Sequence, residues 1–498
     1  MPRSFTAVAL GLTAVLTSIG LALPAAQNQE PGVAVPRFAT RLTPEARSGR
    51  VRALREGRPA PPGEAIVKFR AGVGARRRTL ALRALRGGGR LAASSLGDLE
   101  IIRASGEPDP VQMAEVLARQ PEVEWAEPNY RLRLHAAPND AGFARQWNFN
   151  LIDLPSAWDI NPGGSPSVTV AVIDTGSTTV NAAYALPLWN GSTFANVVVP
   201  FGQNPDLSGG RIRAATDFVF WTGPVVDMVG HGTHVAGTIL QDTNNSFGLA
   251  GIAYATQLMP LKACFGYWEI QFAQGLEGIP GYADEEAGGC FVSEVAAAIR
   301  FAADNGANVI NLSLGGPEQS QTLRDALEYA VARGVFVAVS AGNAFEDGNP
   351  VEYPGADAAR IDGAMSVGAV GRARRRAYYS STGSHVEVVA PGGDFRADGL
   401  PGTIYQYGLF GPDYAPGPSA SPRFNRYYEQ PSQGTSMAAP HVAGLAALLY
   451  SQGIRNPAAI EQAIKATAQD LGPAGRDDEY GYGLIDARAA LRGLGAAR

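Results

Sequence analysis

The chain of 498 residues is 45% apolar and 17% charged, a composition that excludes wholesale disorder and leaves room for about two to four folded units. The net charge of −5 is divided unevenly, because residues 1–135 carry 20 Lys and Arg against 12 Asp and Glu, whereas residues 136–498 carry 21 against 34. Opposite charges on two parts of one chain favour their association. The arginines of the basic part are scattered and have no interleaved aromatic platform, which argues against nucleic-acid binding.

The N-terminus has the pattern of an export signal. Arg3 precedes a mostly apolar run over residues 5–23, and small residues follow. The pattern predicts a secretory signal peptide over residues 1–26 and therefore a secreted protein, extracellular or periplasmic, with no membrane attachment after cleavage. The alternative, an uncleaved membrane anchor, is disfavoured by the glycines within the run.

Residues 27–63 are rich in Pro, Arg and Ala without clear periodicity, and we interpret them as a linker. A tighter pattern over residues 64–135 predicts a small α+β domain. Its order is β-α-β-α-β, with strands expected at 64–70, 99–105 and 123–134 and helices at 76–85 and 109–120. The second helix opens with an Asp109 cap followed by Pro110, both typical of a helix start.

Residues 136–498 alternate apolar runs with helical patterns. Strands are expected at 168–176, 255–264, 307–316, 335–343 and 364–371, with helices at 234–242, 292–306 and 321–334 between them. Such alternation predicts an α/β domain with a mostly parallel central sheet and helices on both of its faces. In sheets of this kind functional groups gather beyond the carboxyl ends of the strands, where Asp174, Asn311 and Asn343 are expected.

Three polar motifs indicate the chemistry of this domain. They are VIDTG at 172–176, GHGTHVAG at 230–237 and GTSMAAPHVAG at 434–444. Ser436 stands where a Gly-Thr turn enters a helix, beside unpaired backbone N–H groups that stabilise an anion. A serine hydroxyl becomes nucleophilic when a histidine such as His231 takes its proton, and a buried carboxylate such as Asp174 orients that histidine.

The motifs occur in the order Asp, His, Ser and resemble those of the subtilisin-like serine proteases, the subtilase family. The resemblance covers nearly all of residues 138–491 and implies a subtilisin-like three-layer fold. It further implies a serine endopeptidase that works through an acyl-enzyme, with Asp174 orienting the base, His231 as general base and Ser436 as nucleophile. The alternative is an inactive relative that only binds peptides, although every catalytic position holds a competent residue.

Residues 64–135 resemble the inhibitory propeptide of these proteases. The resemblance implies a zymogen in which this domain inhibits the catalytic domain, residues 136–498, until the enzyme cleaves itself between Arg133 and Ala137. The charge contrast between the two parts fits such a pairing. We expect the mature enzyme to be a monomer.

The resemblance also implies an oxyanion hole and a substrate cleft. The Asn343 side chain and the Ser436 backbone N–H would bind the oxyanion, the alternative for Asn343 being a turn cap. An extended peptide substrate would add to an edge strand by backbone hydrogen bonds. The cleft residues implied are Ser313, Leu314, Gly315, Gly316, Ala341, Gly342 and Glu352. A carboxylate at the base of the pocket would favour Arg or Lys in the substrate, unless Glu352 faces solvent.

Calcium is a further implication of the resemblance. The segment TNNSFGLAG, residues 243–251, is similar to a calcium loop of the family, and hard oxygen ligands on a flexible loop suit Ca²⁺. The ligands implied are the carbonyls of Thr243, Phe247 and Leu249 and the side chains of Asn245, Asp140 and Asp206. Asp206 departs from the family pattern, because the stretch between Asp174 and Asp206 is longer than usual.

The two cysteines, Cys264 and Cys290, predict a disulfide, because an even number of cysteines in an exported protein usually means bonded pairs. The alternative is two buried free thiols. The glycine-rich stretch between them, residues 265–289, is expected to form a long loop beside the cleft, and residues 392–431 lengthen the approach to Ser436. Both insertions either shape specificity or are inert.

The pair His231 and His234 raises the alternative of a catalytic metal site. Zinc proteases use histidines at i and i+4 with a glutamate after the first, whereas here the spacing is three and Gly232 follows His231. No catalytic metal is therefore expected. We interpret His234 and His441, each beside small packing residues, as hydrogen-bonded structural histidines.

Overall fold

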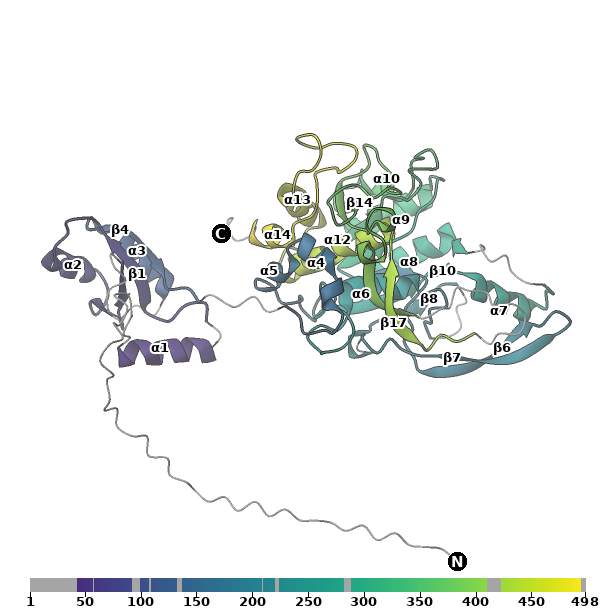
Figure 1. The fold of residues 1–498 in the computed structure, drawn as a ribbon, viewed down its shortest axis with the longest axis horizontal. Helices are drawn as coiled ribbons and strands as arrows, with labels where there is room; N and C mark the ends of the chain where they lie inside the picture. The colour runs from purple at the N-terminus through teal and green to yellow at the C-terminus, as the bar shows by residue number, and fades with distance from the viewer. Residues whose placement is uncertain are drawn as a thin grey trace, which may run out of the picture. The chain divides into compact units, whose positions relative to one another are not determined.

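The structure, a computed structural model, describes residues 43–56, 58–91, 99–106, 109–131, 137–207, 209–219, 224–281, 288–409 and 422–493. The chain forms two compact units, Met1–Arg133 and Leu134–Arg498 (Figure 1). The expected signal peptide and residues 132–136 of the expected cleavage region lie outside the described residues. Within the described ranges, no helix is both long enough and apolar enough to span a membrane.

Unit 1, residues 1–133, contains a four-stranded antiparallel sheet with the strand order β2-β3-β1-β4. Its elements are β1 (Glu64–Phe69), α2 (Ala75–Leu82), β2 (Arg90–Leu91), β3 (Leu99–Arg103), α3 (Pro110–Ala118) and β4 (Val123–Pro128). Alternate residues of β1, Ala65, Val67 and Phe69, share a hydrophobic core with Met113 and Leu117 of α3. The β-α-β-α-β pattern expected from the sequence is present, with the short strand β2 in addition.

The residues expected to form a linker, 27–63, include a helix, α1 (Pro44–Arg55), so the expectation is wrong there. Thr43 caps the N-terminus of this helix through its hydroxyl, and a proline follows in the first turn. The buried residues of the helix are Ala46, Gly49 and Ala53. A face of such small residues lacks the large apolar side chains whose spacing identifies a helix in a sequence. Arg50 holds α1 against β1 by an ion pair with Glu64 at 2.7 Å.

Unit 2, residues 134–498, is built on a seven-stranded sheet in the order β15-β14-β13-β12-β5-β9-β8. Every pair of neighbouring strands in this sheet is parallel. The strands are β5 (Thr169–Asp174), β8 (Thr216–Asp217), β9 (Gln257–Lys262), β12 (Val309–Leu312), β13 (Phe336–Ser340), β14 (Ala364–Val370) and β15 (Val388–Pro391). Along β5, Val170 and Val172 pack into one hydrophobic core and Ala171 and Ile173 into another. Burial on both faces explains why the strands are continuous apolar runs in the sequence.

Helices cover both faces of this sheet, which gives the three-layer α/β arrangement expected (Figure 1). One core contains residues of α6 (His231–Leu240), α12 (Thr435–Ser451), α13 (Pro457–Thr467) and α14 (Ala487–Gly493). The other contains residues of α8 (Val292–Asp304) and α9 (Gln321–Ala332). The short helices α4 (Trp147–Leu151), α5 (Leu154–Trp158), α10 (Gly355–Ala358) and α11 (Phe395–Asp398) connect the larger elements.

The long loop expected at 265–289 is wrong, because much of the segment is a helix, α7 (Tyr267–Glu277). Glu269, in the first turn, accepts a hydrogen bond from the Gly266 N–H at 3.0 Å, and Gly278 ends the helix with a left-handed φ of 69°. The glycines in this stretch therefore mark the ends of a helix. The segment is closed by the antiparallel pair β10 (Cys264–Phe265) and β11 (Gly289–Cys290).

Three inserted segments pack together in unit 2, where β6, β7 and α7 lie side by side (Figure 1). They are the hairpin of β6 (Ala182–Trp189) and β7 (Phe194–Phe201), helix α7, and the pair β16 (Ile404–Leu409) and β17 (Tyr427–Ser432). They share a hydrophobic cluster, here called the annex cluster, of Val199, Phe201, Val226, Met228, Trp268, Phe272, Leu409 and Phe424. The insertions are therefore one packed structure.

Candidate active site

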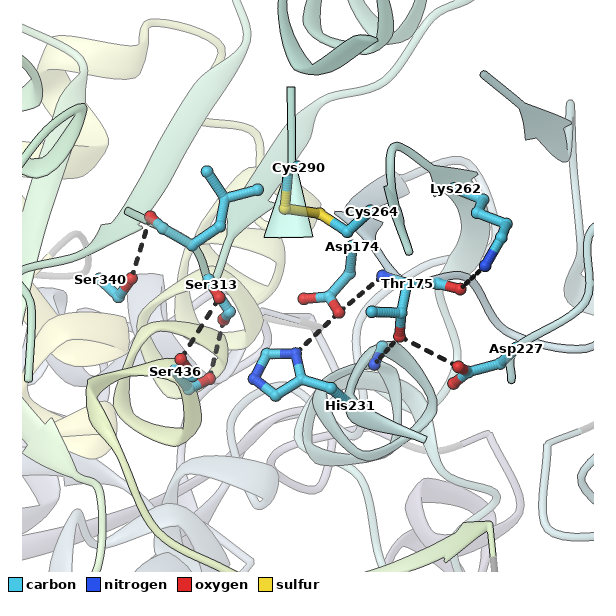
Figure 2. The surroundings of a disulfide bond; sticks show 12 residues. Asp174, Thr175, Asp227, His231, Lys262, Cys264, Cys290, Ser313, Ser340 and Ser436 are labelled. Atoms are coloured by element: carbon cyan, nitrogen blue, oxygen red, sulfur yellow. Dashed lines mark hydrogen bonds and ion pairs between the residues drawn. A yellow bond between two sulfur atoms is a disulfide. The ribbon is translucent and has the colours of Figure 1, made fainter. Parts of the chain in front are cut away.

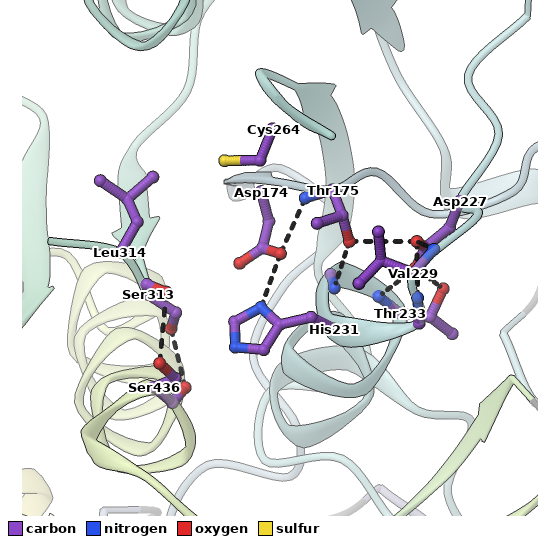
Figure 3. A network of polar contacts seen from close by, with 12 residues as sticks. Asp174, Thr175, Asp227, Val229, His231, Thr233, Cys264, Ser313, Leu314 and Ser436 are labelled. Carbon is purple, nitrogen blue, oxygen red and sulfur yellow. Dashed lines mark hydrogen bonds and ion pairs between the residues drawn. The ribbon is translucent and has the colours of Figure 1, made fainter. Parts of the chain in front are cut away.

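Asp174 and His231 form a hydrogen-bonded pair at the carboxyl end of β5. Asp174 is the last residue of this strand and is 2% exposed, whereas His231 is the first residue of α6. The distance from His231 Nδ1 to Asp174 Oδ1 is 2.7 Å (Figure 3). A carboxylate at Nδ1 keeps the proton on that nitrogen, so Nε2 is the basic nitrogen and lies on the side of the ring toward Ser436.

The glycines on both sides of His231 determine how the imidazole is placed. Gly230 has a φ of 97°, a left-handed conformation that lets the chain turn directly into α6. Gly232 packs against the chain that leaves β5, and a Cβ there would lie 2.3 Å from the Gly176 carbonyl oxygen. A side chain at either position would displace the start of α6 and the histidine with it.

Ser436 is the second residue of α12 and lies opposite the imidazole (Figure 3). Its Oγ donates to the Ser313 carbonyl at 3.3 Å, and the Ser313 Oγ donates to the Ser436 carbonyl at 2.7 Å. These two bonds tie the first turn of α12 to the segment that follows β12. The first N–H groups of a helix have no helical acceptor, and the helix dipole favours negative charge beside them.

Asn343 follows β13 and presents its amide group beside Ser436. Its Oδ1 accepts hydrogen bonds from the Thr435 N–H and the Thr435 hydroxyl, each at 2.9 Å. Since the oxygen is occupied, Nδ2 is the end left to donate. A Cβ built on Gly434 would lie 3.6 Å from the Ser436 nitrogen and 3.8 Å from Asn343 Nδ2, so both donors border one small space. Two such donors are the arrangement that stabilises an oxyanion.

The predicted cleft segments approach the carboxylate of Glu352 from two sides. One side consists of Ser313, Leu314, Gly315 and Gly316. Gly316 exchanges backbone hydrogen bonds with Tyr353 at 2.9 and 2.7 Å, an isolated bridge, and the pairing of this segment with a substrate peptide stays a prediction. On the other side Ala341 is fully buried, and its N–H continues the sheet by donating to the Val367 carbonyl at 2.9 Å.

Glu352 lies between these two segments. Its Oε1 accepts hydrogen bonds from the Asn343 N–H at 2.9 Å and the Ala344 N–H at 3.2 Å. A Cβ on Gly342 would lie 2.3 Å from the same oxygen, and one on Gly315 would lie 3.6 Å from Oε2. The two glycines thus leave the room that the carboxylate occupies, and the side chain is half-buried there.

A cavity of 370 Å³ opens beside Asp174 and His231. It is lined on one side by residues 264–268 and 288–290 of the inserted segment, and elsewhere by Met228, Val229, Ser313 and Leu314. The predicted disulfide between Cys264 and Cys290 is confirmed and lies next to Asp174 (Figure 2). The insertion therefore forms part of the wall of the cleft.

The sequence profile described as the Subtilase family matches residues 165–483, more than half of the chain. The chain belongs to the subtilase family. It is 32% identical over 424 residues to the "Thermophilic serine proteinase" of Bacillus sp. (strain AK1), which covers 84% of this chain and 85% of that protein. It is also 33% identical over 350 residues to "Subtilisin BL" of Lederbergia lenta, covering 70% of this chain and 98% of that protein.

A third relative is the "Extracellular protease" of Xanthomonas campestris pv. campestris, 32% identical over 426 residues, which cover 79% of this subtilase and 63% of that protein. Among solved structures, a protease of Pseudoalteromonas arctica PAMC 21717 matches with a TM-score of 0.53 and 29% identity, covering 72% of this chain and 99% of that chain. The expected fold is confirmed, and the chain is a subtilisin-like serine endopeptidase, an enzyme that binds peptides as substrates.

Behind Asp174, this subtilase has a buried polar network that the motifs alone did not single out. It consists of Thr175, Asp227, Lys262 and Glu269, which are joined by hydrogen bonds and an ion pair, and Figure 2 shows the first three of these residues. Two signals in the sequence point to it. Asp227 stands four residues before His231, and Lys262 is the single charged residue of its strand and ends the apolar run at 258–261.

The residues expected to bind calcium converge in this subtilase. Asn244 donates its N–H to Asp140 at 2.9 Å, while the Asn245 side chain and the Leu249 N–H each donate to Asp206 at 2.8 Å. The unusual length of chain before Asp206 does not displace it, because the β6–β7 hairpin takes up the extra residues. Both aspartates therefore meet the loop at residues 243–251.

The surroundings of Asp206 are rich in negative charge. Its pKa is raised to about 7, chiefly by burial and in part by the carboxylates of Asp242 and Asp140, against the hydrogen bonds from Leu249 and Asn245. Thr243 and Phe247 belong to the same loop, where the Thr243 hydroxyl accepts from the Gly251 N–H at 3.0 Å and the Phe247 ring packs on Tyr407. Among the described residues no three His, Cys, Asp or Glu side chains form a metal cluster, so a cation here would depend on carbonyl and amide oxygens.

His234 and His441 are both fully buried and hydrogen-bonded. His234 Nε2 lies 3.1 Å from the Ile404 carbonyl and 3.2 Å from the Gln430 carbonyl, so α6 is joined to β16 and β17. His441 Nδ1 donates to the Met437 carbonyl at 2.8 Å, and Nε2 lies 2.8 Å from Asn148 Nδ2. Burial lowers the pKa of each histidine to about 4, so both are neutral at pH 7, as expected of structural residues.

Proposed function

We propose that this subtilase hydrolyses peptide bonds through Asp174, His231 and Ser436. The observation that carries the proposal is the convergence of these side chains from β5, α6 and α12, with Asp174 bonded to His231 Nδ1 at 2.7 Å. The residue types suit the task, because a buried carboxylate, an imidazole and a hydroxyl in this order generate a nucleophile at neutral pH.

In the proposed reaction, Ser436 Oγ attacks the carbonyl carbon of the scissile bond while His231 Nε2 takes the hydroxyl proton. The carbonyl oxygen becomes an oxyanion and accepts from Asn343 Nδ2 and the Ser436 N–H. Collapse of this intermediate expels the amine, which receives the proton from His231 and leaves an acyl ester on Ser436. Water then attacks the ester, His231 takes its proton, and the carboxylic product leaves as Ser436 regains its hydrogen.

Replacing the nucleophile tests this assignment. Ser436→Ala is expected to lower kcat by several orders of magnitude and to abolish labelling by a fluorophosphonate, because no hydroxyl remains to be acylated. Peptide binding should persist, which separates the enzyme from the alternative of an inactive peptide-binding relative. Hydrolysis by the Ser436→Ala protein at the rate of the parent would contradict the proposal.

For substrate preference, we propose that Glu352 selects Arg or Lys at the residue before the cleaved bond. Its half-buried carboxylate between Gly315 and Gly342 supports this, because a cation entering that space would find an opposite charge in a partly dehydrated site. In a peptide library we expect Arg over Leu by at least about tenfold in kcat/KM, which is ~1.4 kcal/mol of discrimination. Glu352→Gln should remove this preference, because the amide is uncharged while its oxygen can still accept from the Asn343 and Ala344 N–H groups.

We further propose that the enzyme is made as a secreted precursor whose residues 64–135 inhibit it until self-cleavage between Arg133 and Ala137, after which it is a monomer. The name of the Xanthomonas campestris relative, "Extracellular protease", supports secretion. The basic charge of residues 1–135 and the acidic charge of the remainder support the pairing. N-terminal sequencing of the secreted protein should find a start at 134–138, and a start within 64–130 would contradict it.

Finally, we propose a structural calcium ion at the loop of residues 243–251. The buried Asp206, with Asp140 against the same loop, supports it, because a cation would offset the charge of these two carboxylates. The ligands would be Asp140, Asp206, Asn245 and the carbonyls of Thr243, Phe247 and Leu249. The ion would stabilise the fold and take no part in the chemistry. Chelation should lower the Tm, and added Ca²⁺ should restore it, whereas Mg²⁺ should not.

A further inference from the structure

Thr175, the residue after Asp174, is held at each of its polar atoms. Its N–H donates to Asp174 Oδ1 at 2.7 Å, and its carbonyl accepts from Lys262 Nζ at 2.7 Å. Its hydroxyl donates to Asp227 at 3.0 Å and accepts from the Gly232 N–H at 2.9 Å (Figures 2 and 3). Thr175 therefore joins the carboxylate of Asp174 to the first turn of α6, and its position affects both members of the Asp174–His231 pair.

Lys262 is the residue that holds the Thr175 carbonyl. It is fully buried at the end of β9, where it is the register partner of Asp174, and the next N–H, that of Ala263, donates to the Asp174 carbonyl at 2.9 Å. Burial lowers the pKa of Lys262, but the charges of Glu269 and Asp227 outweigh this, so its pKa stands above the ordinary value. Lys262 is thus a charged group that depends on its acidic partners.

Glu269 supplies the closest of these partners. Its Oε1 lies 2.7 Å from Lys262 Nζ, and the two side chains are 1% and 0% exposed. Its Oε2 accepts from the Gly266 N–H at 3.0 Å and so caps α7. Glu269 belongs to the inserted segment closed by the disulfide, so the ion pair exists only when the insertion is folded.

Neither member of this ion pair lines the cavity beside Asp174. A peptide in the cleft would therefore contact neither, and a contribution to the reaction would have to pass through Thr175. The available connection is short: Glu269 to Lys262, Lys262 to the Thr175 carbonyl, and the Thr175 N–H to Asp174.

We propose that Glu269 and Lys262 are positioning residues for the Asp174–His231 pair. The inserted helix α7 supplies, through Glu269, the charge that keeps Lys262 in place to hold Thr175. The insertion is then part of the catalytic apparatus as well as a wall of the cleft. This inference rests on the proposed catalytic roles of Asp174 and His231, and it adds a requirement that the motifs do not contain.

The charges around His231 give the inference a signature in the pH profile. His231 interacts with Asp174 on β5 and with His234 on α6, and the network behind Asp174 adds the charges of Asp227 before α6, Lys262 on β9 and Glu269 on α7. Loss of the positive charge of Lys262 favours the protonated imidazole, so the acid limb of kcat/KM moves to higher pH. Loss of the negative charge of Glu269 moves the same limb to lower pH.

The test compares Glu269→Gln, Lys262→Met and the double variant. Each is produced as the full-length precursor, allowed to mature, and assayed below its own unfolding temperature. Each single variant should lower kcat at least about tenfold, because small displacements of a catalytic group are costly, with KM unchanged. The acid limbs should move in opposite directions. In the double variant the limb should return toward the parent while kcat stays low, because the Thr175 carbonyl still lacks its donor.

Two variants control for stability alone. Glu277→Gln makes the same chemical change at an exposed position of α7, and Lys465→Met breaks a buried ion pair with Glu387 in unit 2. If the Glu269 and Lys262 variants lower only the Tm, as Lys465→Met should, and leave kcat and the acid limb unchanged, the inference is overturned. If Lys262→Met does not fold, Glu269→Gln decides, since Gln in the first turn still caps α7.

Failure of the proposed mechanism gives a different result. Ser436→Ala and His231→Ala would then retain activity whatever the Glu269 variants do. The amount of competent enzyme in the Glu269 and Lys262 variants, which retain Ser436, is measured by fluorophosphonate titration, so that a loss of kcat is not confused with a loss of matured protein.

Discussion

Removal of the Cys264–Cys290 disulfide should lower the Tm of unit 2 by about 5 °C. The bond spans a sequence separation of 26 residues, and the chain-entropy relation gives about 3.6 kcal/mol for a loop of this length. Unit 2 has about 365 residues, so at ~2.1 cal/mol/K of unfolding entropy per residue this free energy corresponds to a fall of about 5 °C. The bond also lines the cavity beside Asp174, so kcat/KM should fall as well.

The thermal measurement uses Cys264→Ser with Cys290→Ser in a Ser436→Ala background, because an active protease digests its own unfolded chains. Circular dichroism then follows unfolding in both proteins, and kcat/KM is measured in the active background. A reductant should lower the Tm of the parent to that of the variant and leave the variant unchanged. A variant Tm within about 1 °C of the parent would refute the reasoning, since the loop-closure effect would then be absent.

Asn343→Leu should lower kcat about 10²–10³-fold in steady-state peptide hydrolysis with little change in KM. A rise in KM of that size with kcat unchanged would contradict a role of Asn343 at the oxyanion. Without calcium, Asp206 should contribute stability that is lost as the pH rises from about 4 to about 7, because burial raises its pKa to about 7 and the folded chain keeps a proton that the unfolded chain releases. The buried His234 and His441, whose pKa is lowered to about 4, act in the opposite direction, so the measured quantity is the difference in unfolding free energy between the parent and Asp206→Asn, which should change over this pH range. Asn148→Leu should cost about 1–3 kcal/mol of stability by denaturant titration, because it removes the side-chain amide 2.8 Å from the buried His441 Nε2.

The layers of unit 2 and the segments of its candidate active site could be predicted because each is encoded locally. Strands buried on both faces are continuous apolar runs, and Asp174, His231 and Ser436 each lie in a short motif with the glycines that shape the adjoining turn. The structure adds the reason for these glycines, since Gly230 adopts a left-handed conformation and Gly232 packs on the Gly176 carbonyl. The sequence predicts the position of a polar side chain well where the same short segment also contains the glycines that shape the adjoining turn.

Features that depend on contacts between distant segments were missed or misjudged. Helix α1 has a buried face of small residues, and α7 is bounded by glycines, so neither has the strong apolar period of a helix. Glu269 and Lys262 are seven residues apart on a helix and a strand, and nothing in that spacing indicates that their side chains meet. Their pairing follows only from the fold of the inserted segment.

The annex cluster limits which segments of this chain can be deleted or exchanged separately. Trp268, Phe201 and Leu409 come from three separate insertions but are buried against one another. Deleting one insertion would expose a contiguous apolar surface on the other two, and such surfaces promote aggregation. Shortened or chimaeric versions of this enzyme should therefore remain soluble only when all three segments are exchanged together. The three insertions form a single packed unit, although they are far apart in the sequence.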